Sequence, residues 1–300
     1  KNRPDFPACS RIRTFFNSTY SDRVSSMQMF ASFRTYLTIS GLFLTLGFTG
    51  CSWFAGSVDE NILTGNIHWE GEVRIQGKVV IEKGATLTIA PGTRVLFMPY
   101  TEENPDQKRG PHELRGSKLL VHGQLVARGT AYEPIVFSYY DSNAPAGSWG
   151  GIKIQDAEEV YFYNCEFRQA MNAIHSCRSW VSIEYSKFEN NKVGILFHNA
   201  RLFIERTLFR NNGTAVYYLS GSPVIAENKI ANNDNGLVIA DVSEDYLIEK
   251  NSFLENRSYN VGLGERVRRS VNLRNNYWGK KAGDASELRL FDGRSSLWKG

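Results

Sequence analysis

The chain has 300 residues, of which 42% are hydrophobic and nine are proline. A chain of this length and composition can bury a sizeable core, so we expect one globular body and no extensive disorder. The formal net charge is +4, but residues 1–51 hold six Lys or Arg and two Asp or Glu, whereas residues 52–300 hold 29 of each. Because nucleic acids and anionic lipids are bound by concentrated basic fields, this balance argues against a nucleic-acid partner.

The first part of the chain carries a targeting pattern. The segment LTISGLFLTLGFTGCS (37–52) follows Arg34, and its apolar run is shorter than the roughly 20 residues that span a bilayer. Such a run is typical of the apolar region of a signal peptide. The residues from Phe48 to Cys51 resemble the bacterial lipobox, which is cut before a cysteine that carries lipid. A signal peptide with an incidental cysteine, or a buried helix, is the alternative.

These features predict the organisation of the N-terminal region. Translation is expected to start at Met27 or Met29, and the predicted parts are an upstream extension (1–26), a signal peptide (27–50), and an anchor and linker (51–61). Lipidation of Cys51 would attach the protein to a membrane surface through more than one acyl chain. The predicted location is therefore the bacterial cell envelope, as an outer-membrane lipoprotein, with a periplasmic or secreted protein as the alternative.

A repeat organises the rest of the chain. Large apolar residues recur at intervals of 21 and then of 23 and 25 residues, at Phe167, Phe188, Phe209, Ile230, Phe253 and Trp278. Seven and five positions before four of these anchors, further apolar residues alternate with the period of two that indicates a strand. A helical solenoid needs about 30 or more residues per repeat and a 3.6-residue period, so stacked coils of short parallel strands are predicted instead.

Small or polar residues recur at two positions of each repeat. Asparagine tolerates turn conformations, and stacked asparagines can pass amide hydrogen bonds from one coil to the next. We therefore predict a structural ladder made of Asn191, Asn212, Asn233 and Asn256 after the anchors, and of Asn228, Asn251 and Asn276 before them. The close bends are assigned to Gly194 and Gly236.

The repeat and its flanking phrases resemble the right-handed parallel β-helix proteins, in the pectate-lyase-like and NosD-like superfamily and of the bacterial lipoprotein type. The phrases are GKVVIEKGATLTIAPGTRVLF (77–97), KLLVHGQLVARGTAYEPIVF (118–137), GSWGGIKI (147–154) and NNYWG (275–279). The resemblance implies an all-β fold, a right-handed parallel β-helix of about 21-residue coils over residues 62–280. It leaves residues 281–300 as a C-terminal cap or tail. One fold hosts many functions, so it does not fix an activity.

One charged segment interrupts this pattern. Residues 98–117 are rich in charge and proline and predict a projecting loop, which serves either for recognition or as a tolerated insertion.

Metal and catalytic motifs are weak. Asp156, Glu158 and Glu159 form a dense acidic group, but no recognisable base or carboxylate pair accompanies it. No catalytic residue is therefore assigned, and a bound calcium ion is expected only if the protein is an enzyme. The cysteines form no CxxC pair, and no metal site is predicted. Cys165 and Cys177 either form a disulfide in an oxidising compartment or remain separate thiols.

Aromatic residues are the remaining candidates for binding. A flat ring matches the apolar face of a sugar, and the candidate residues are Trp149, Tyr161, Tyr163, Tyr217 and Tyr218, although core positions are expected for Trp149 and Trp278. Consecutive tyrosines must point one ring outward from a strand.

The predicted function is a non-catalytic scaffold, attached to the membrane by its lipid anchor, that binds a polysaccharide or an envelope protein. The alternative is a polysaccharide lyase, epimerase or hydrolase acting in a groove along the coil.

Overall fold

The computed structural model describes residues 52–54, 57–59, 62–101, 115–242, 245–279 and 289–293. The predicted extension 1–26, the signal peptide 27–50 and Cys51 lie outside the described residues, as does most of the predicted loop 98–117.

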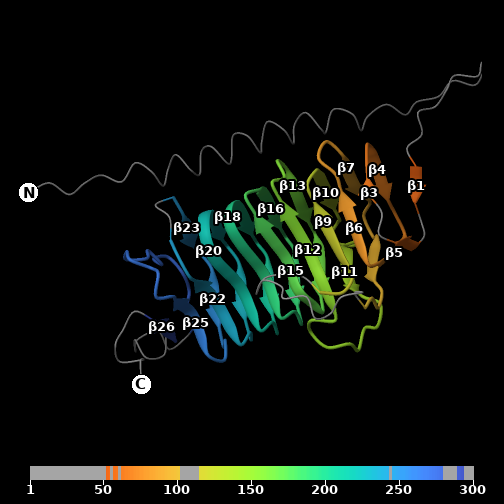
Figure 1. Ribbon diagram of the computed structural model, residues 1–300. Coiled ribbons are helices and arrows are strands. Elements are labelled where there is room, and N and C mark those ends of the chain that lie inside the picture. Colours follow the sequence, from red (N-terminus) through yellow and green to blue (C-terminus); the bar gives the residue numbers. More distant parts are fainter. Residues whose placement is uncertain are drawn as a thin grey trace, which may run out of the picture. The chain divides into compact units, whose positions relative to one another are not determined.

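The described residues form a solenoid in which each coil contributes one strand to each of three faces. All pairings between its 26 strands are parallel, and Figure 1 shows the strands stacked in chain order along the solenoid. The first face consists of β1 (Ser52–Phe54), β4 (Asn66–Trp69), β7 (Thr86–Ile89), β10 (Gln124–Arg128), β13 (Val160–Tyr163), β16 (Trp180–Glu184), the C-terminal parts of β18 (Val193–Glu205) and β20 (Thr214–Ala226), and β23 (Leu247–Glu249).

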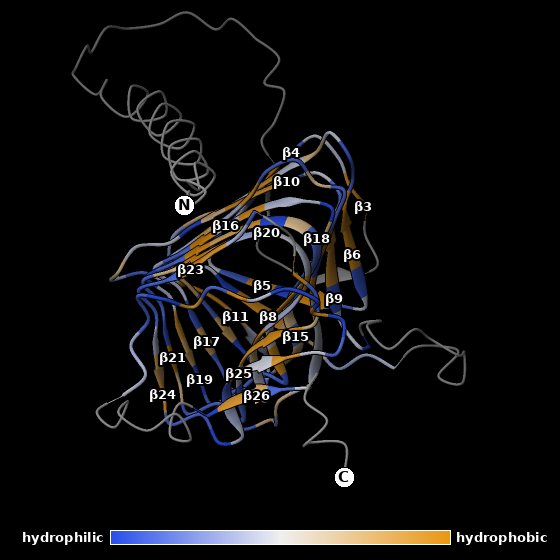
Figure 2. Ribbon diagram, turned by 90° about the vertical axis from the view of Figure 1, so that its left-hand side faces the viewer, coloured by the Kyte–Doolittle hydropathy of each residue, from blue (hydrophilic) through white to orange (hydrophobic). Residues whose placement is uncertain are grey.

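The second face consists of β2 (Ser57–Asp59), β5 (Glu72–Gln76), β8 (Arg94–Phe97), β11 (Ile135–Tyr139), β14 (Cys165–Arg168), β17 (Lys187–Glu189), β19 (Leu208–Arg210), β21 (Lys229–Ala231) and β24 (Ser252–Leu254). The third face consists of β3 (Ile62–Leu63), β6 (Lys78–Ile81), β9 (Lys118–Val121), β12 (Trp149–Gln155), β15 (Ala170–Cys177), the N-terminal parts of β18 and β20, β22 (Asn235–Ile239), β25 (Tyr259–Leu263) and β26 (Leu290–Asp292). Figure 2 looks along the solenoid and shows β16 and β23 on one face and β17, β19, β21 and β24 on another. Because β18 and β20 continue around a corner, the first and third faces share one 17-stranded sheet, and the second face is a separate 9-stranded sheet.

The register confirms the predicted repeat and fold class. Phe167 pairs with Phe188, Phe188 with Phe209, and Phe209 with Ile230, each 21 residues further along the chain. The solenoid has about nine such coils, spaced about 22 residues apart. The coil also extends beyond the predicted limits of 62–280. Strands β1 and β2 lie in the predicted linker, and β26 lies in the predicted tail, where strands of only three residues are too short to show a sequence period.

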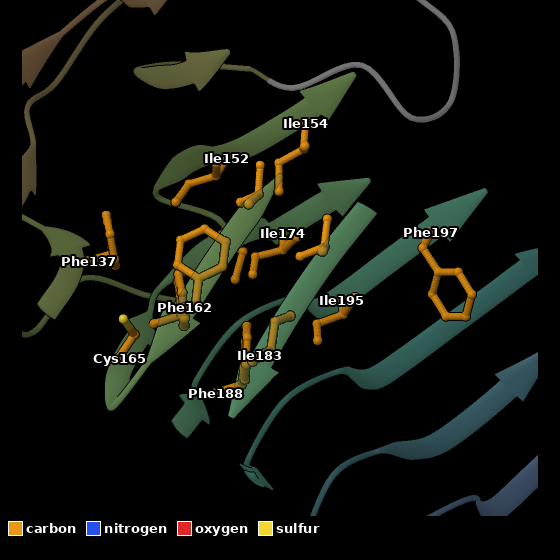
Figure 3. Close-up of a cluster of buried hydrophobic side chains, with 14 of the residues drawn as sticks. Phe137, Ile152, Ile154, Phe162, Cys165, Ile174, Ile183, Phe188, Ile195 and Phe197 are labelled. Carbon is orange, nitrogen blue, oxygen red and sulfur yellow. The ribbon is translucent and has the colours of Figure 1, made fainter. Parts of the chain in front are cut away.

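Inward side chains from all three faces form one continuous apolar core. Figure 3 shows this packing around Phe162, Ile174, Ile183 and Phe188. On the second face the anchor rings stack directly, with centroid distances of 4.5 Å for Phe167–Phe188 and 4.9 Å for Phe188–Phe209. Each ring buries a large apolar area and stacks on the ring of the next coil. Because the rings can stack only if the anchors recur at a nearly constant interval, the coils have similar lengths.

The ladder residues occupy two corners of the coil. Asn191, Asn212, Asn233 and Asn256 follow the second face, whereas Asn228, Asn251 and Asn276 precede it. The Asn212 Nδ2 atom donates to Asn233 Oδ1 at 2.9 Å and to the carbonyl oxygen of Phe188 at 3.0 Å. In the other corner, Asn228 Nδ2 donates to Asn251 Oδ1 at 3.0 Å. The side chains therefore link neighbouring coils and also satisfy backbone carbonyls that the corners leave without partners.

The left-handed backbone conformation belongs to the residue before each ladder asparagine. Asn190, Asn211 and Asn232 all have φ of 56°. In the other corner this position is taken by residues such as Glu227 and Lys250, with φ of 59° and 57°. The preceding residue makes the bend, so the ladder side chain is free to point inward.

Gly194 lies where two coils approach closely. A Cβ atom at this position would stand 2.5 Å from the carbonyl oxygen of Ala215, which excludes any side chain. Here glycine is required by the packing of the coils, because the backbone itself fills the available space.

Candidate functional site

Four aromatic side chains lie together on the outer surface of the first face, and we call Tyr161, Tyr163, Trp180 and Tyr185 the aromatic strip. The inward neighbours Val160 and Phe162 are buried, so strand alternation directs Tyr161 and Tyr163 outward. The rings of Tyr161 and Trp180 lie 5.0 Å apart at 66°, and those of Tyr163 and Tyr185 lie 5.2 Å apart at 57°. The strip thus joins two aromatic pairs across the neighbouring strands β13 and β16.

Arginine side chains cover both ends of the aromatic strip. The Arg128 Cζ atom lies 5.7 Å from the ring centroid of Tyr161, and the Arg206 Cζ atom lies 5.5 Å from that of Tyr185. Arg206 Nη2 also lies 2.8 Å from a carboxylate oxygen of Glu227. Guanidinium groups over the rings orient them and place donors at the margins of the aromatic surface.

Two carboxylates border the aromatic strip. Glu184 and Glu205 are direct register partners, and Tyr163 pairs with Glu184 in the same outward column. Glu184 is 6% exposed and accepts a hydrogen bond from Ser182 Oγ at 3.1 Å. Burial is the largest cause that raises the pKa of Tyr163 above its ordinary value, and the neighbouring Tyr185 and Glu184 raise it further. Its phenol therefore stays protonated at neutral pH and can donate a hydrogen bond beside two carboxylate acceptors.

Two of the predicted binding residues lie in the core instead. Trp149 is fully buried, stacks on Phe97 at 3.7 Å between centroids, and donates from Nε1 to the carbonyl oxygen of Arg168 at 2.7 Å. Tyr218 is also fully buried, and its hydroxyl donates to the carbonyl oxygen of Gly221 at 2.8 Å. Neither ring can contact a ligand, so both predictions as binding residues are wrong; the core position expected for Trp149 is the observed one.

Tyr217 points outward but lies on the third face, away from the aromatic strip. Its register partners are Leu196 and Val238.

On the third face, Cys177 Sγ lies 3.4 Å from His175 Nε2, and burial raises the pKa of the Cys177 thiol. A thiol with a raised pKa is a poor nucleophile at neutral pH, so this pair does not supply an activated cysteine.

Cys165 and Cys177 are both free thiols. Within the described part of the chain, no three His, Cys, Asp or Glu side chains are placed to bind a metal ion together. The same residues contain no helix long and apolar enough to cross a bilayer.

The acidic group at 156–159 lies at the corner between the third and first faces. Both oxygens of Asp156 are held by Arg178, through Nε to Oδ1 at 2.7 Å and Nη2 to Oδ2 at 2.8 Å. This hydrogen bonding lowers the pKa of Asp156. Asp156 therefore remains ionised and paired, which suits neither a general acid nor a free calcium ligand.

Two models of known protein families match the chain. A family model described as "Right handed beta helix region" matches residues 137–277, and another described as "Pectate-lyase like beta helix domain" matches residues 56–160. Both matches lie on the observed parallel solenoid. The chain is a right-handed β-helix repeat protein. No curated protein and no solved structure matches it.

The second face of the β-helix has a different outer surface. Charged side chains pair along it, with Glu166 beside Arg168, and Glu189 between Lys187 and Arg210. These charged side chains pair with one another along the face, and they offer no aromatic surface. The aromatic strip therefore distinguishes the first face of the β-helix from the second.

Trp180 and Tyr185 were not among the residues predicted to bind, although the repeat contains a signal for Trp180. Val181 and Ile183 occupy the inward strand positions, so the same alternation directs Trp180 outward. No period indicates Tyr185, because it lies at a corner of the β-helix with φ of 50°. The contact of the two aromatic pairs depends on the register between coils.

Proposed function

We propose that this β-helix is a non-catalytic binding module that holds a polysaccharide against the aromatic strip. The outward pair of Tyr161 and Trp180 carries the proposal. Aromatic rings offer flat apolar surfaces to the C–H faces of sugars, while nearby hydroxyl, carboxylate and guanidinium groups can bond sugar hydroxyls.

The scaffold favours binding because its strands hold the strip in place. The aromatic residues stand on hydrogen-bonded strands of adjacent coils, with the exception of the corner residue Tyr185. A preformed site of this kind loses little conformational entropy when a ligand binds. An extended polymer also matches a surface that continues from one coil to the next.

We further propose that the module is held at the bacterial cell envelope through lipid on Cys51. The support is the sequence pattern at 37–52, since this region lies outside the described residues. An anchored binder would meet polysaccharide at the membrane surface. An envelope protein is the other partner class, and the binding experiment separates the two.

The purified protein should be tested on a glycan array, followed by calorimetry with each glycan that binds. Trp180→Ala and Tyr161→Ala should each weaken binding about tenfold or more, which corresponds to about 1.4 kcal/mol, because each removes an aromatic surface. Tyr217→Ala is the matched control, since it removes an outward tyrosine from the third face. Equal losses in all three variants, or no glycan binding by the unaltered protein, would contradict the proposal.

The enzyme alternative is favoured by one observation. Lys83, His122, Asp156 and Glu158, which come from three consecutive coils, line a common cavity at the corner between the third and first faces. A lyase, epimerase or hydrolase would convert a glycan there, with or without added calcium. We expect no turnover of the glycans that bind, because Asp156 is held as an ionised partner of Arg178; product formation abolished by His122→Ala would establish the enzyme instead.

A further inference from the structure

The corner cavity arises from a difference in corner length between successive coils. The corner from β9 to β10 has only residues 122–123, whereas the corners before and after it comprise residues 82–85 and 156–159. The short corner is recessed between two longer ones and leaves a notch of about 290 Å³. Its lining residues are Lys83, Gly84, Thr86, His122, Gly123, Gln124, Asp156 and Glu158.

One lining residue of the notch, Gly123, cannot carry a side chain. A Cβ atom on Gly123 would stand 2.3 Å from the carbonyl oxygens of Glu82 and Ala85, so no side chain fits there. Thr86 Oγ1 donates to Gln124 Oε1 at 3.2 Å, which leaves the Gln124 amide nitrogen as a donor.

His122 adds an acceptor to the notch. Its Nδ1 atom lies 3.1 Å from the carbonyl oxygen of Gln155. Because a carbonyl oxygen only accepts hydrogen bonds, Nδ1 carries the proton and Nε2 of the neutral ring is an acceptor. The notch thus offers both donors and acceptors to a small polar molecule.

The two lips of the notch carry opposite charges. Lys83 belongs to the corner on one side, and Glu158 belongs to the corner on the other. Within the described ranges, neither side chain forms an ion pair, whereas Asp156 is already paired with Arg178. One cation and one anion therefore remain available on opposite sides of the recess.

We propose that the notch binds a small zwitterion of the amino-acid type, with its carboxylate at Lys83 and its ammonium group at Glu158. A simple anion would face the carboxylates of Glu158 and Asp156, and a simple cation would face Lys83, so a ligand with both charges matches best. The cavity volume lies at the lower end of the range for ligand pockets, which suits a molecule smaller than most drugs. This site is separate from the aromatic strip and does not depend on polysaccharide binding.

The test is a titration of the full protein with free amino acids, followed by NMR or calorimetry. The comparison ligands are the N-acetyl derivatives, which lack the ammonium group, and the amino-acid amides, which lack the carboxylate. Free amino acids should bind, and loss of either charge should weaken binding about tenfold or more. Equal binding of N-acetyl derivatives, equal binding of amides, or no binding of any free amino acid would overturn the proposal.

Matched variants assign the two contacts. Lys83→Gln should remove the preference for a free carboxylate, and Glu158→Gln should remove the preference for a free ammonium group. Lys229→Gln and Glu133→Gln remove one exposed charge of each sign elsewhere on the coil and should leave binding unchanged. All four variants should keep the unfolding temperature of the original protein, since these side chains are exposed; an unchanged preference in Lys83→Gln or Glu158→Gln would refute the site.

Discussion

At the residue scale, the ladder asparagines show how a polar side chain can stabilise the interior of a solenoid. Asn212 is 2% exposed, accepts from the Asn191 backbone and side-chain nitrogens at 3.0 Å each, and donates to Asn233 and to the Phe188 carbonyl. Each partner is buried with it. Loss of the amide would therefore leave several buried polar groups without a hydrogen-bond partner.

We predict that Asn212→Leu lowers the free energy of unfolding by about 1–3 kcal/mol or more, because buried partners lose their hydrogen bonds. The measurement is denaturant unfolding followed by circular dichroism. Asn66→Leu is the control, since Asn66 is an exposed strand residue. A stability loss no larger than in the control would show that the ladder contributes little.

At the element scale, ion pairing joins neighbouring strands of the second face. Glu189 of β17 lies 2.7 Å from Lys187 Nζ and also pairs with Arg210 of β19. Burial alone would raise the pKa of Glu189, but hydrogen bonds from Lys187 and Arg210 outweigh it and lower the pKa. The folded state thus favours the ionised carboxylate.

This shift predicts a pH-dependent contribution to stability. Since the folded pKa lies below the unfolded value, the contribution is present above the unfolded pKa and is lost as the pH falls through the folded pKa. Glu189→Gln should lower the free energy of unfolding by about 1–2 kcal/mol at neutral pH, and the difference should vanish in strong acid. Urea unfolding across this range checks it, with exposed Glu133→Gln as the control. A difference that does not change with pH would rule out the ionic origin.

At the scale of the whole molecule, the solenoid separates stability from recognition. Inward residues form one core along the coil, while the outer surfaces of the faces differ from one another. Each coil contacts mainly its neighbours, so outward residues can change without disturbing the core. A rigid body of this kind suits display at a surface, which is the role that the proposed lipid anchor would serve.

Changing Cys51→Ser should release the protein from the membrane fraction into the soluble envelope fraction, because the acyl chains would have no attachment. Cell fractionation with immunoblotting measures this. Cys177→Ser is the control, as it alters a thiol within the coil and should leave the protein at the membrane. Unchanged membrane association of Cys51→Ser would refute lipidation at this residue.

Regular patterns in the sequence predicted the coil, its repeat length and its inward residues. Apolar anchors recur at regular intervals, and apolar residues alternate before them. Only stacked coils can bury residues with this spacing, so the pattern correctly predicted that Phe167, Phe188 and Phe209 form one column. The asparagine positions were equally regular. Composition does not indicate which residue of each corner takes the left-handed backbone, and in the structure it is the residue before each ladder asparagine.

Contacts between outward residues, in contrast, depend on how the coils stack in three dimensions. Tyr161 and Trp180 are 19 residues apart and become neighbours because the register sets β13 beside β16. The notch likewise depends on corner lengths in three coils, which bring Lys83 and Glu158 to opposite sides of one recess. Hydrophobic periodicity specifies which side of a strand is buried, but contacts on the outer surface depend on how coils of unequal length stack.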